Sequence, residues 1–211
     1  MKLSLKAKKI RVQKILETLH QLFPEPISEL EYNQPYELVL AVIMSAQTTD
    51  VQVNKVTRFL FQKYPTLESF ANADPEELAV DMHGTGFFRA KSRNVILTSQ
   101  MLLKTFGGVV PSGMKDLITL PGAARKTANV LQRELFNIHE GVAVDTHIIR
   151  LANQLELTES PNPVIIERDL MKITPPEEWG MISIGLILYG RRFWKARQPD
   201  KGILSLNLGL L

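Results

Sequence analysis

The stretch LPGAARKTANV, residues 120–130, joins two helical patterns through a Pro-Gly turn. A helical stretch near 114–119 runs into Pro121-Gly122, and a new helix resumes directly afterwards. A hairpin of this kind exposes backbone N–H groups at the start of the second helix, where they bind phosphate without reading base sequence. The segment therefore predicts a helix-hairpin-helix that contacts a nucleic-acid backbone.

Lys126 falls in the first turn of that second helix. The positive end of the helix dipole disfavours the ammonium form there, and a neutral lysine is a potential amine nucleophile. The same segment is equally consistent with an ordinary surface lysine after a Pro-Gly turn. On this segment alone, the nucleophile and the surface lysine both stay open.

The segment VAVDTHIIR, residues 142–150, brings Asp145 to the start of another helix after an apolar approach. Local sequence of this kind is typical of a helix N-cap. A carboxylate at the end of an apolar approach also suits a cleft, and the two roles are compatible. Lysine together with aspartate is what breaking a glycosidic bond with an amine nucleophile requires.

A third segment, LAVIMSAQTTD at residues 40–50, ends a buried helix in a polar cluster. Asp50 or Thr49 is suited to cap the helix that follows. Gln47, at the tip of the preceding helix, is well placed to enter a DNA stack and hydrogen-bond an orphaned base. Taken alone, a residue in this position is more often an ordinary loop glutamine.

Composition narrows the class of protein around these segments. The chain has 211 residues, 45% of them hydrophobic, enough for one large or two small domains with a real core. Its net charge is 25 − 22 = +3, which permits nucleic-acid binding. It has no cysteine, which excludes disulfides, thiol nucleophiles and Cys-ligated clusters. No apolar stretch has membrane-spanning length and no secretion signal opens the chain, so an intracellular protein is expected, in the cytoplasm or nucleoid if bacterial.

Helical periodicity dominates the pattern, and no alternating strand pattern or fixed repeat competes with it. The sequence predicts an all-α protein with about ten helices, beginning with an amphipathic helix that stops before Pro24. Residues 37–46 predict a helix buried on nearly every face. Asp74-Pro75 and Asn162-Pro163 predict helix N-termini, each with a capping residue and a first-turn proline.

Together these segments resemble the endonuclease III family, bifunctional DNA glycosylases of the helix-hairpin-helix superfamily. The order and spacing of five collinear segments match over roughly residues 10–202, nearly the whole chain. The segments are SAQTTDVQVNK (45–55), HGTGFFRAKSRNV (83–95), LPGAARKTANVL (120–131), VAVDTHIIRLANQL (142–155) and LILYGRRFWKARQP (186–199).

The resemblance implies a two-domain helix-hairpin-helix glycosylase fold. A six-helix barrel would span residues 28–140, and residues 1–27 would join 141–211 in the second domain, with a DNA-binding cleft between them. The implied partner is double-stranded DNA containing damaged bases or abasic sites, with no membrane partner. A monomer is expected, because the fold needs one chain.

The resemblance also assigns residues. Lys126 matches the catalytic lysine and Asp145 the catalytic aspartate. Gln47 matches the residue that fills the gap left by an extruded nucleotide, and Phe87 falls where the family inserts an apolar wedge. His147 is either a lesion-pocket residue or a histidine of the helix surface. The hairpin residues expected at the DNA are Gly122, Ala124, Arg125 and Thr127.

The implied activity is base excision with strand cleavage at abasic (AP) sites. The damaged base leaves the duplex by flipping, Lys126 attacks C1′ to give a Schiff base, and β-elimination cuts the strand. Oxidised pyrimidines are the expected substrates. The alternatives are a glycosylase for thymine or uracil mismatched with guanine, and a DNA-binding relative without catalysis.

The chain departs from the family pattern at several positions. The family's four cysteines, which bind a [4Fe–4S] cluster, correspond here to Trp194, Lys201, Leu204 and Leu210. No iron–sulfur cluster or other cofactor is therefore expected, and the apolar tail 202–211 is expected to pack in its place. The scattered histidines predict no metal site.

Two departures lie next to the hairpin. Ala124 replaces its second glycine, at a cost on the order of 1 kcal/mol if φ is positive there. Ile118 replaces a common glutamate just before the hairpin and removes a polar neighbour. Altered substrate choice or reduced turnover is the expected consequence.

Overall fold

The computed structural model describes residues 3–24 and 28–196, and every regular element within these ranges is a helix. The predicted all-α class is therefore confirmed. The chain divides into a central unit, Ser28–Asn137, and a terminal unit that combines Met1–Ile27 with Ile138–Leu211. Residues 138–140, expected in the barrel domain, belong to the terminal unit instead.

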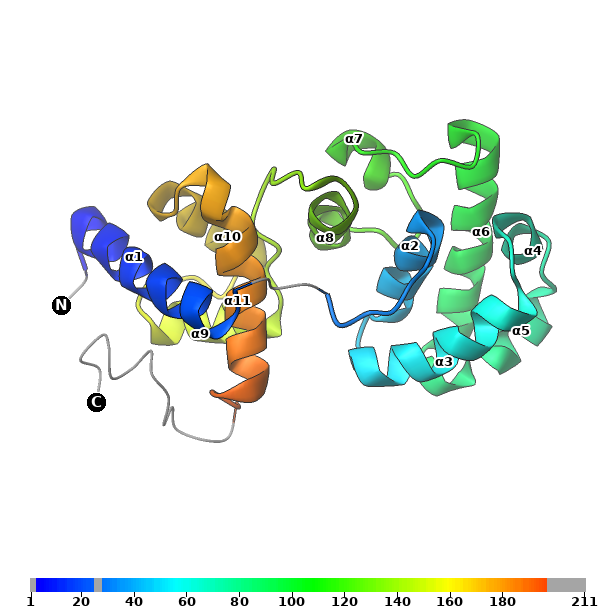
Figure 1. Cartoon of the computed structure of the whole chain (residues 1–211), viewed down its shortest axis with the longest axis horizontal. Coiled ribbons are helices and arrows are strands. Elements are labelled where there is room, and N and C mark those ends of the chain that lie inside the picture. The colour runs from blue at the N-terminus through cyan, green and yellow to red at the C-terminus, as the bar shows by residue number, and fades with distance from the viewer. Residues whose placement is uncertain (1–2, 25–27, 197–211) are drawn as a thin grey trace. The chain divides into compact units, whose positions relative to one another are not determined.

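The helices of the central unit follow one another along the chain, whereas the terminal unit combines the first helix with the last ones (Figure 1). Those of the central unit are α2 (Pro35–Met44), α3 (Asp50–Lys63), α4 (Leu67–Ala71), α5 (Pro75–Asp81), the 3₁₀ turn η1 (His83–Thr85), α6 (Phe88–Phe106), α7 (Met114–Leu117) and α8 (Arg125–Phe136). Those of the terminal unit are α1 (Leu5–Leu22), α9 (Thr146–Gln154), α10 (Pro163–Ile173), the 3₁₀ turn η2 (Pro176–Glu178) and α11 (Trp179–Arg192).

Helix α2 forms the centre of the central unit, in contact with α3, α6 and α8 (Figure 1). Every residue from Glu37 to Met44 is buried, as the apolar pattern predicts. A capping box fixes the start of this helix, since the Glu37 carboxylate accepts the backbone N–H groups of Asn33 at 2.6 Å and Gln34 at 3.1 Å. The hydrogen bonds satisfy a buried carboxylate and set the direction in which α2 enters the core.

The predicted helix N-termini are confirmed by their hydrogen bonds. Asp74 Oδ1 accepts the N–H groups of Glu76 at 3.0 Å and Glu77 at 2.9 Å at the start of α5. Asn162 Oδ1 accepts Val164 N–H at 2.9 Å at the start of α10. A proline follows each cap, where its missing N–H costs nothing.

Helix α11 is the core element of the terminal unit, buried from Gly180 to Gly190. Its contacts with α1 and α9 are close because two glycines face them. A Cβ on Gly185 would lie 2.9 Å from Leu19 Cδ1 of α1, and one on Gly190 would lie 2.7 Å from His147 Nδ1 of α9. Both glycines thus allow helix packing that any side chain would prevent.

The first helix is tied to the second half of the chain by its basic residues. Arg11 donates to Leu155 O at 3.0 Å and pairs with Glu156 at 2.6 Å, while Lys8 Nζ donates to Leu157 O at 3.1 Å. These bonds satisfy carbonyl groups at the end of α9. They fix α1 beside a segment more than 140 residues away in sequence.

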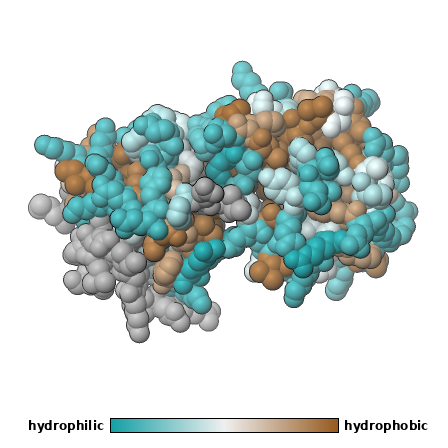
Figure 2. Space-filling model, viewed as in Figure 1, coloured by the Kyte–Doolittle hydropathy of each residue, from teal (hydrophilic) through white to brown (hydrophobic). Residues whose placement is uncertain are grey.

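The surface is mainly hydrophilic on the face shown in Figure 2, with hydrophobic residues in separate patches. Exposed large hydrophobic side chains include Val51, Val80, Phe87 and Val164. Across residues 3–24 and 28–196, no helix is long and apolar enough to cross a membrane.

Candidate active site

The predicted hairpin is present as α7, a turn at residues 118–124, and α8. Gly122 has φ +83°, and a Cβ at this position would lie 2.8 Å from Asn94 Nδ2 of α6. Thr98, also on α6, donates its hydroxyl to Pro121 O at 2.9 Å. The turn therefore needs glycine both for its backbone angle and for its close approach to α6.

Ala124 is the N-cap of α8 and has φ −94° and ψ 174°, which is extended backbone. The expected cost of replacing glycine applied only to a positive φ. Because φ is negative at Ala124, this alanine carries no left-handed strain. Ala124 supplies no side-chain cap for α8. The first backbone N–H groups of α8 have no acceptor within the helix, and the N-cap residue provides none. Groups of this kind can bind an anion.

Lys126 is the second residue of α8 and is exposed. Arg125 and Thr127 flank it, so this turn presents two cations beside the uncapped N–H groups. Ile118, at the other end of the turn, is 48% exposed and offers no polar group in place of a glutamate. The arrangement combines a primary amine with a surface suited to phosphate.

Asp145 caps α9, since its Oδ1 accepts Ile148 N–H at 2.9 Å. The N-cap interpretation is thereby confirmed. The carboxylate is half-buried, behind the buried residues 142–144, and its Oδ2 makes no hydrogen bond to the described part of the chain. Burial lowers the pKa of Arg150, and the negative charge of Asp145 acts in the opposite direction and raises it. The aspartate therefore keeps one oxygen for another partner while the other holds the helix.

His147 lies on the first turn of α9 with its imidazole against Gly190 of α11. It is half-buried. This contact supports a packing role at the helix surface, and contact with DNA remains a prediction for this residue.

Gln47 and Phe87 are both exposed and both have left-handed backbones, with φ 54° and φ 48°. For residues other than glycine this conformation costs on the order of 1 kcal/mol or more. Phe87 is 71% exposed at the start of α6. Thr49, rather than Asp50, caps α3 after the Gln47 turn, accepting Gln52 N–H at 3.3 Å. We call Gln47 and Phe87 the two tips.

The structure links the segments next to the two tips through Lys91, a residue that sequence reasoning missed. Lys91 Nζ donates to Thr48 Oγ1 at 2.8 Å and to Thr85 O, and Thr48 Oγ1 donates to Thr85 O at 2.5 Å. Lys91 is 5% exposed, and burial lowers its pKa. Its spacing could have indicated that it is buried, because Lys91 lies on the same face of α6 as Val95, Thr98 and Leu102.

The described residues do not fit the iron–sulfur cluster of the resembled family. The whole chain lacks cysteine, and Trp194, at the first ligand position, is 8% exposed within the hydrophobic core of the terminal unit. Its carbonyl accepts a hydrogen bond from Arg150. The other three positions and the tail 202–211 lie outside the described residues. In the described ranges, no three potential metal-ligating side chains gather.

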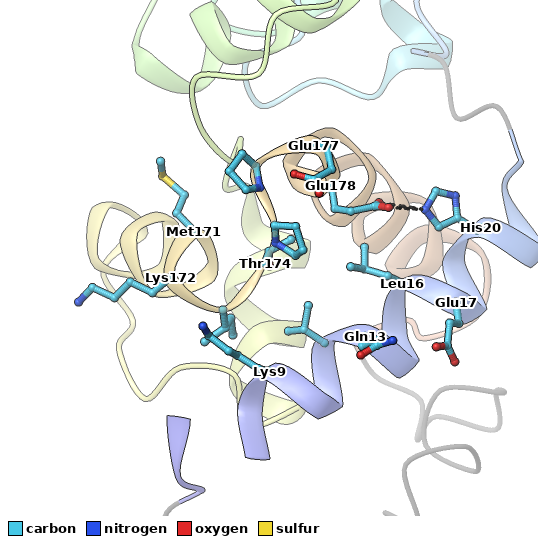
Figure 3. A pocket seen from close by; sticks show the side chains of 14 residues that line it. Lys9, Gln13, Leu16, Glu17, His20, Met171, Lys172, Thr174, Glu177 and Glu178 are labelled. Carbon is cyan, nitrogen blue, oxygen red and sulfur yellow. Dashed lines mark hydrogen bonds and ion pairs between the residues drawn. The ribbon is translucent and has the colours of Figure 1, made fainter. Parts of the chain in front are cut away.

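A cavity of about 770 Å³ lies in the terminal unit between α1 and the turn from α10 to η2 (Figure 3). Val12, Leu16 and Ile173 supply its apolar lining, and His20 pairs with Glu178 at 2.9 Å beside it. The residues that line it include none of the predicted site residues. In the central unit, the candidate residues lie on the hairpin and at the two tips. In the terminal unit, the candidate residue is Asp145.

Comparison with known proteins gives matches over most of the chain. Residues 40–176 match the family described as HhH-GPD superfamily base excision DNA repair protein. Endonuclease III of Synechocystis sp. is 45% identical over 200 residues, which cover 95% of this chain and 91% of that protein.

Two solved structures extend the similarity to three dimensions. A trapped endonuclease III–DNA covalent intermediate, an estranged-adenine complex, matches with a TM-score of 0.86 at 38% identity, covering 91% of this chain and 90% of that chain. A non-covalent endonuclease III–DNA complex matches with a TM-score of 0.88 at 37% identity, covering 94% of both chains.

Proposed function

Because the chain belongs to the HhH-GPD superfamily of base excision DNA repair proteins, we propose that it removes oxidised pyrimidines from duplex DNA. It is a DNA glycosylase with AP lyase activity, in keeping with its endonuclease III relatives. The observation that carries the residue assignment is Lys126, an exposed amine in the uncapped first turn of α8.

We assign the nucleophile to Lys126. Its neutral amine attacks C1′ of the deoxyribose, and the C1′–N bond breaks as the base leaves with the bonding electrons and takes up a proton. The sugar ring then opens to a Schiff base. Loss of a C2′ proton expels the 3′ phosphate and cuts the strand, and hydrolysis returns the lysine.

We assign charge stabilisation to Asp145. Its half-buried carboxylate would offset the positive charge that develops on the sugar as the base departs, and would assist proton transfer. The N-cap bond to Ile148 N–H supports this role by fixing the carboxylate, since Oδ2 remains available. The Asp145→Asn variant separates the two roles of this residue. It removes the negative charge but keeps a side-chain oxygen that can accept Ile148 N–H.

The remaining assignments concern DNA. The turn formed by Gly122, Ala124, Arg125 and Thr127 is proposed to hold a phosphate at the start of α8, because its N–H groups lack a side-chain cap. Gln47 is proposed to fill the gap left by the flipped nucleotide and Phe87 to enter the opposite strand.

We propose that the enzyme works as a monomer and without an iron–sulfur cluster. The absence of cysteine and the buried Trp194 support the second point. Because its substrate is DNA, its place of action is inside the cell. Light scattering at micromolar concentration tests the monomer, and iron analysis of the purified protein tests the cofactor.

Borohydride trapping tests the function. Wild-type protein is incubated with a duplex carrying thymine glycol or an abasic site, beside Lys126→Ala and Lys115→Ala variants. Lys115 is exposed on α7 of the same hairpin and serves as the matched lysine control. Adducts with wild type and Lys115→Ala, but none with Lys126→Ala, are expected.

Other outcomes separate the alternatives. An adduct in all three proteins would move the nucleophile to another amine. Base release from thymine or uracil opposite guanine, and none from thymine glycol, would replace oxidised pyrimidines with mismatches. DNA binding with neither base release nor an adduct would leave the non-catalytic alternative.

A further inference from the structure

The two tips have an unusual conformational requirement. Gln47 and Phe87 are exposed, carry side chains beyond Cβ, and nevertheless adopt left-handed backbones at φ 54° and φ 48°. Exposed residues in this region relax to more common angles unless their neighbours are held. The cause of their conformation therefore lies in the residues next to them.

Those neighbours are joined by hydrogen bonds at one point. Thr48 directly follows Gln47, and Thr85 lies two residues before Phe87. The carbonyl of Thr85 accepts two hydrogen bonds, one from Thr48 Oγ1 at 2.5 Å and one from Lys91 Nζ. Lys91 Nζ also donates to Thr48 Oγ1 at 2.8 Å, so each of the three residues bonds to both of the others. We call this set the Lys91 triad.

The triad is anchored on both sides. Thr85 is fully buried, and its own hydroxyl donates to Met82 O at 2.9 Å, which fixes the turn η1. Lys91 begins the second turn of α6, the helix whose first residue follows Phe87. The triad therefore restrains the backbone next to each tip.

A lysine is an expensive residue for packing alone. Lys91 is 5% exposed, and no carboxylate of the described ranges pairs with it, so its ammonium gives up hydration for two neutral oxygens. Burial lowers its pKa, as this environment requires. An apolar residue would fill the same stripe of α6 at lower cost. What lysine supplies is a donor long enough to reach both loops.

We propose that Lys91 is a positioning residue that locks the Gln47 and Phe87 tips into one rigid unit, so that both enter the duplex together when a base is extruded. This inference rests on the proposed function, because the tips have a task only if the protein flips nucleotides. It assigns no chemical step to Lys91. Its effect falls on extrusion, and the reaction of a sugar that is already accessible does not depend on it.

Two substrates separate extrusion from chemistry. Thymine glycol paired with adenine has to be unpaired and extruded before its sugar reacts, whereas a preformed abasic site carries no base to extrude. Single-turnover rates of base release and of abasic-site cleavage are measured for wild type, Lys91→Met and Thr48→Val. Met is an unbranched side chain one atom shorter than lysine and lacks the donor, and Val matches the shape of threonine without the hydroxyl.

Ser99→Ala is the matched control. Ser99 is a fully buried residue of α6 whose hydroxyl donates only within its own helix, to Val95 O at 2.8 Å. It therefore reports the effect of a buried polar deletion in α6 that leaves both tips in place.

Lys91→Met is expected to slow release of thymine glycol by roughly tenfold to a hundredfold, the scale of an ångström-sized misplacement. In the same variant, the rate of abasic-site cleavage is expected to change by less than about threefold. Thr48→Val is expected to slow thymine glycol release selectively as well, but by a smaller factor. Equal loss on both substrates, or no loss on either, would overturn the inference. If Lys91→Met does not fold, Thr48→Val decides.

Failure of the proposed function has a different signature. A wild-type protein that acts on neither substrate removes the proposed function, and the role of Lys91 with it. A wild-type protein active on both, with variants that show no selectivity, removes only the role of Lys91.

Discussion

Two lysines of the central unit show how position decides what a lysine can do. Lys126 stands exposed in the first turn of α8, after a turn that no side chain caps. Lys91 is buried on the inner face of α6 and bonds only to oxygens of two loops. The first has its amine available for a substrate, and the second has its amine committed to the protein. Accessibility therefore separates a proposed nucleophile from a proposed positioning group.

The largest effect is expected from Lys126→Arg, which keeps the charge and removes the reactive amine. Base release and cleavage should fall by at least about a thousandfold, because arginine stays protonated and forms no Schiff base. Affinity for duplex DNA should change by less than about threefold, since the cation is retained. Single-turnover assays and a filter-binding titration measure the two quantities. Retention of substantial lyase activity would show that the two lysines do not divide the work in this way.

The second prediction concerns the backbone of the hairpin that carries Lys126. Gly122→Ala should destabilise the protein by roughly 2–4 kcal/mol, from the left-handed angle and from a Cβ placed 2.8 Å from Asn94 Nδ2. Gly107→Ala is the control, because Gly107 has φ +61° with nothing within 4 Å of a Cβ. Its loss should be about 1–2 kcal/mol. Urea unfolding measures both, and equal losses would remove the packing contribution of Asn94.

The comparison of the two lysines also explains which features sequence reasoning reached. Local spacing, which acts over one or two helical turns, predicts the caps at Asp74 and Asn162 and the buried α2. It also predicts the position of Lys126 in the first turn of a helix, whereas the role of this lysine stays a prediction. Lys91 depends on Thr48 and Thr85, and only the folded chain brings the Thr48 loop, 43 residues away, to it. Its position on an apolar stripe of α6 indicates that its ammonium group needs hydrogen-bond acceptors. The sequence around Lys91 does not show which residues provide them.

Backbone angles were the other feature out of reach. The family pattern has glycine where Ala124 stands, and a positive φ was a reasonable condition to attach to it. The structure places the positive angle at Gly122 instead and leaves Ala124 extended. Gln47 and Phe87, in contrast, adopt positive φ with no glycine to announce it. The backbone angles of a turn depend on its tertiary contacts as well as on its amino-acid sequence.

The third prediction concerns the buried lysine and pH. Burial lowers the pKa of Lys91 below the value of 10.5 that applies in the unfolded chain. Between the two values the unfolded chain binds more protons than the folded one, so the free energy of unfolding rises with pH. Lys91→Met lacks this contribution.

Urea unfolding of wild type and Lys91→Met between pH 7 and pH 10.5 measures the difference. The wild type should gain stability relative to the variant as pH rises. Lys115→Met, which removes an exposed lysine of α7, is the matched control and should follow the wild type. Parallel curves for wild type and Lys91→Met throughout this range would mean that Lys91 is better solvated than its 5% exposure indicates.

The smallest effect is expected from Ala124→Gly, which restores the residue of the family pattern. Were φ positive at this position, glycine would stabilise the protein by about 1 kcal/mol. Ala124 has φ −94°, so that gain is absent. Two smaller contributions remain. Glycine is a better N-cap than alanine, but it gives the unfolded chain more conformational freedom. They offset each other, and the free energy of unfolding should stay within about 0.5 kcal/mol of wild type. A gain of about 1 kcal/mol in urea unfolding would show that Ala124 is strained in solution. An unchanged value would mean that this alanine leaves the hairpin intact, and that any change in turnover at this turn arises from DNA contact and not from folding.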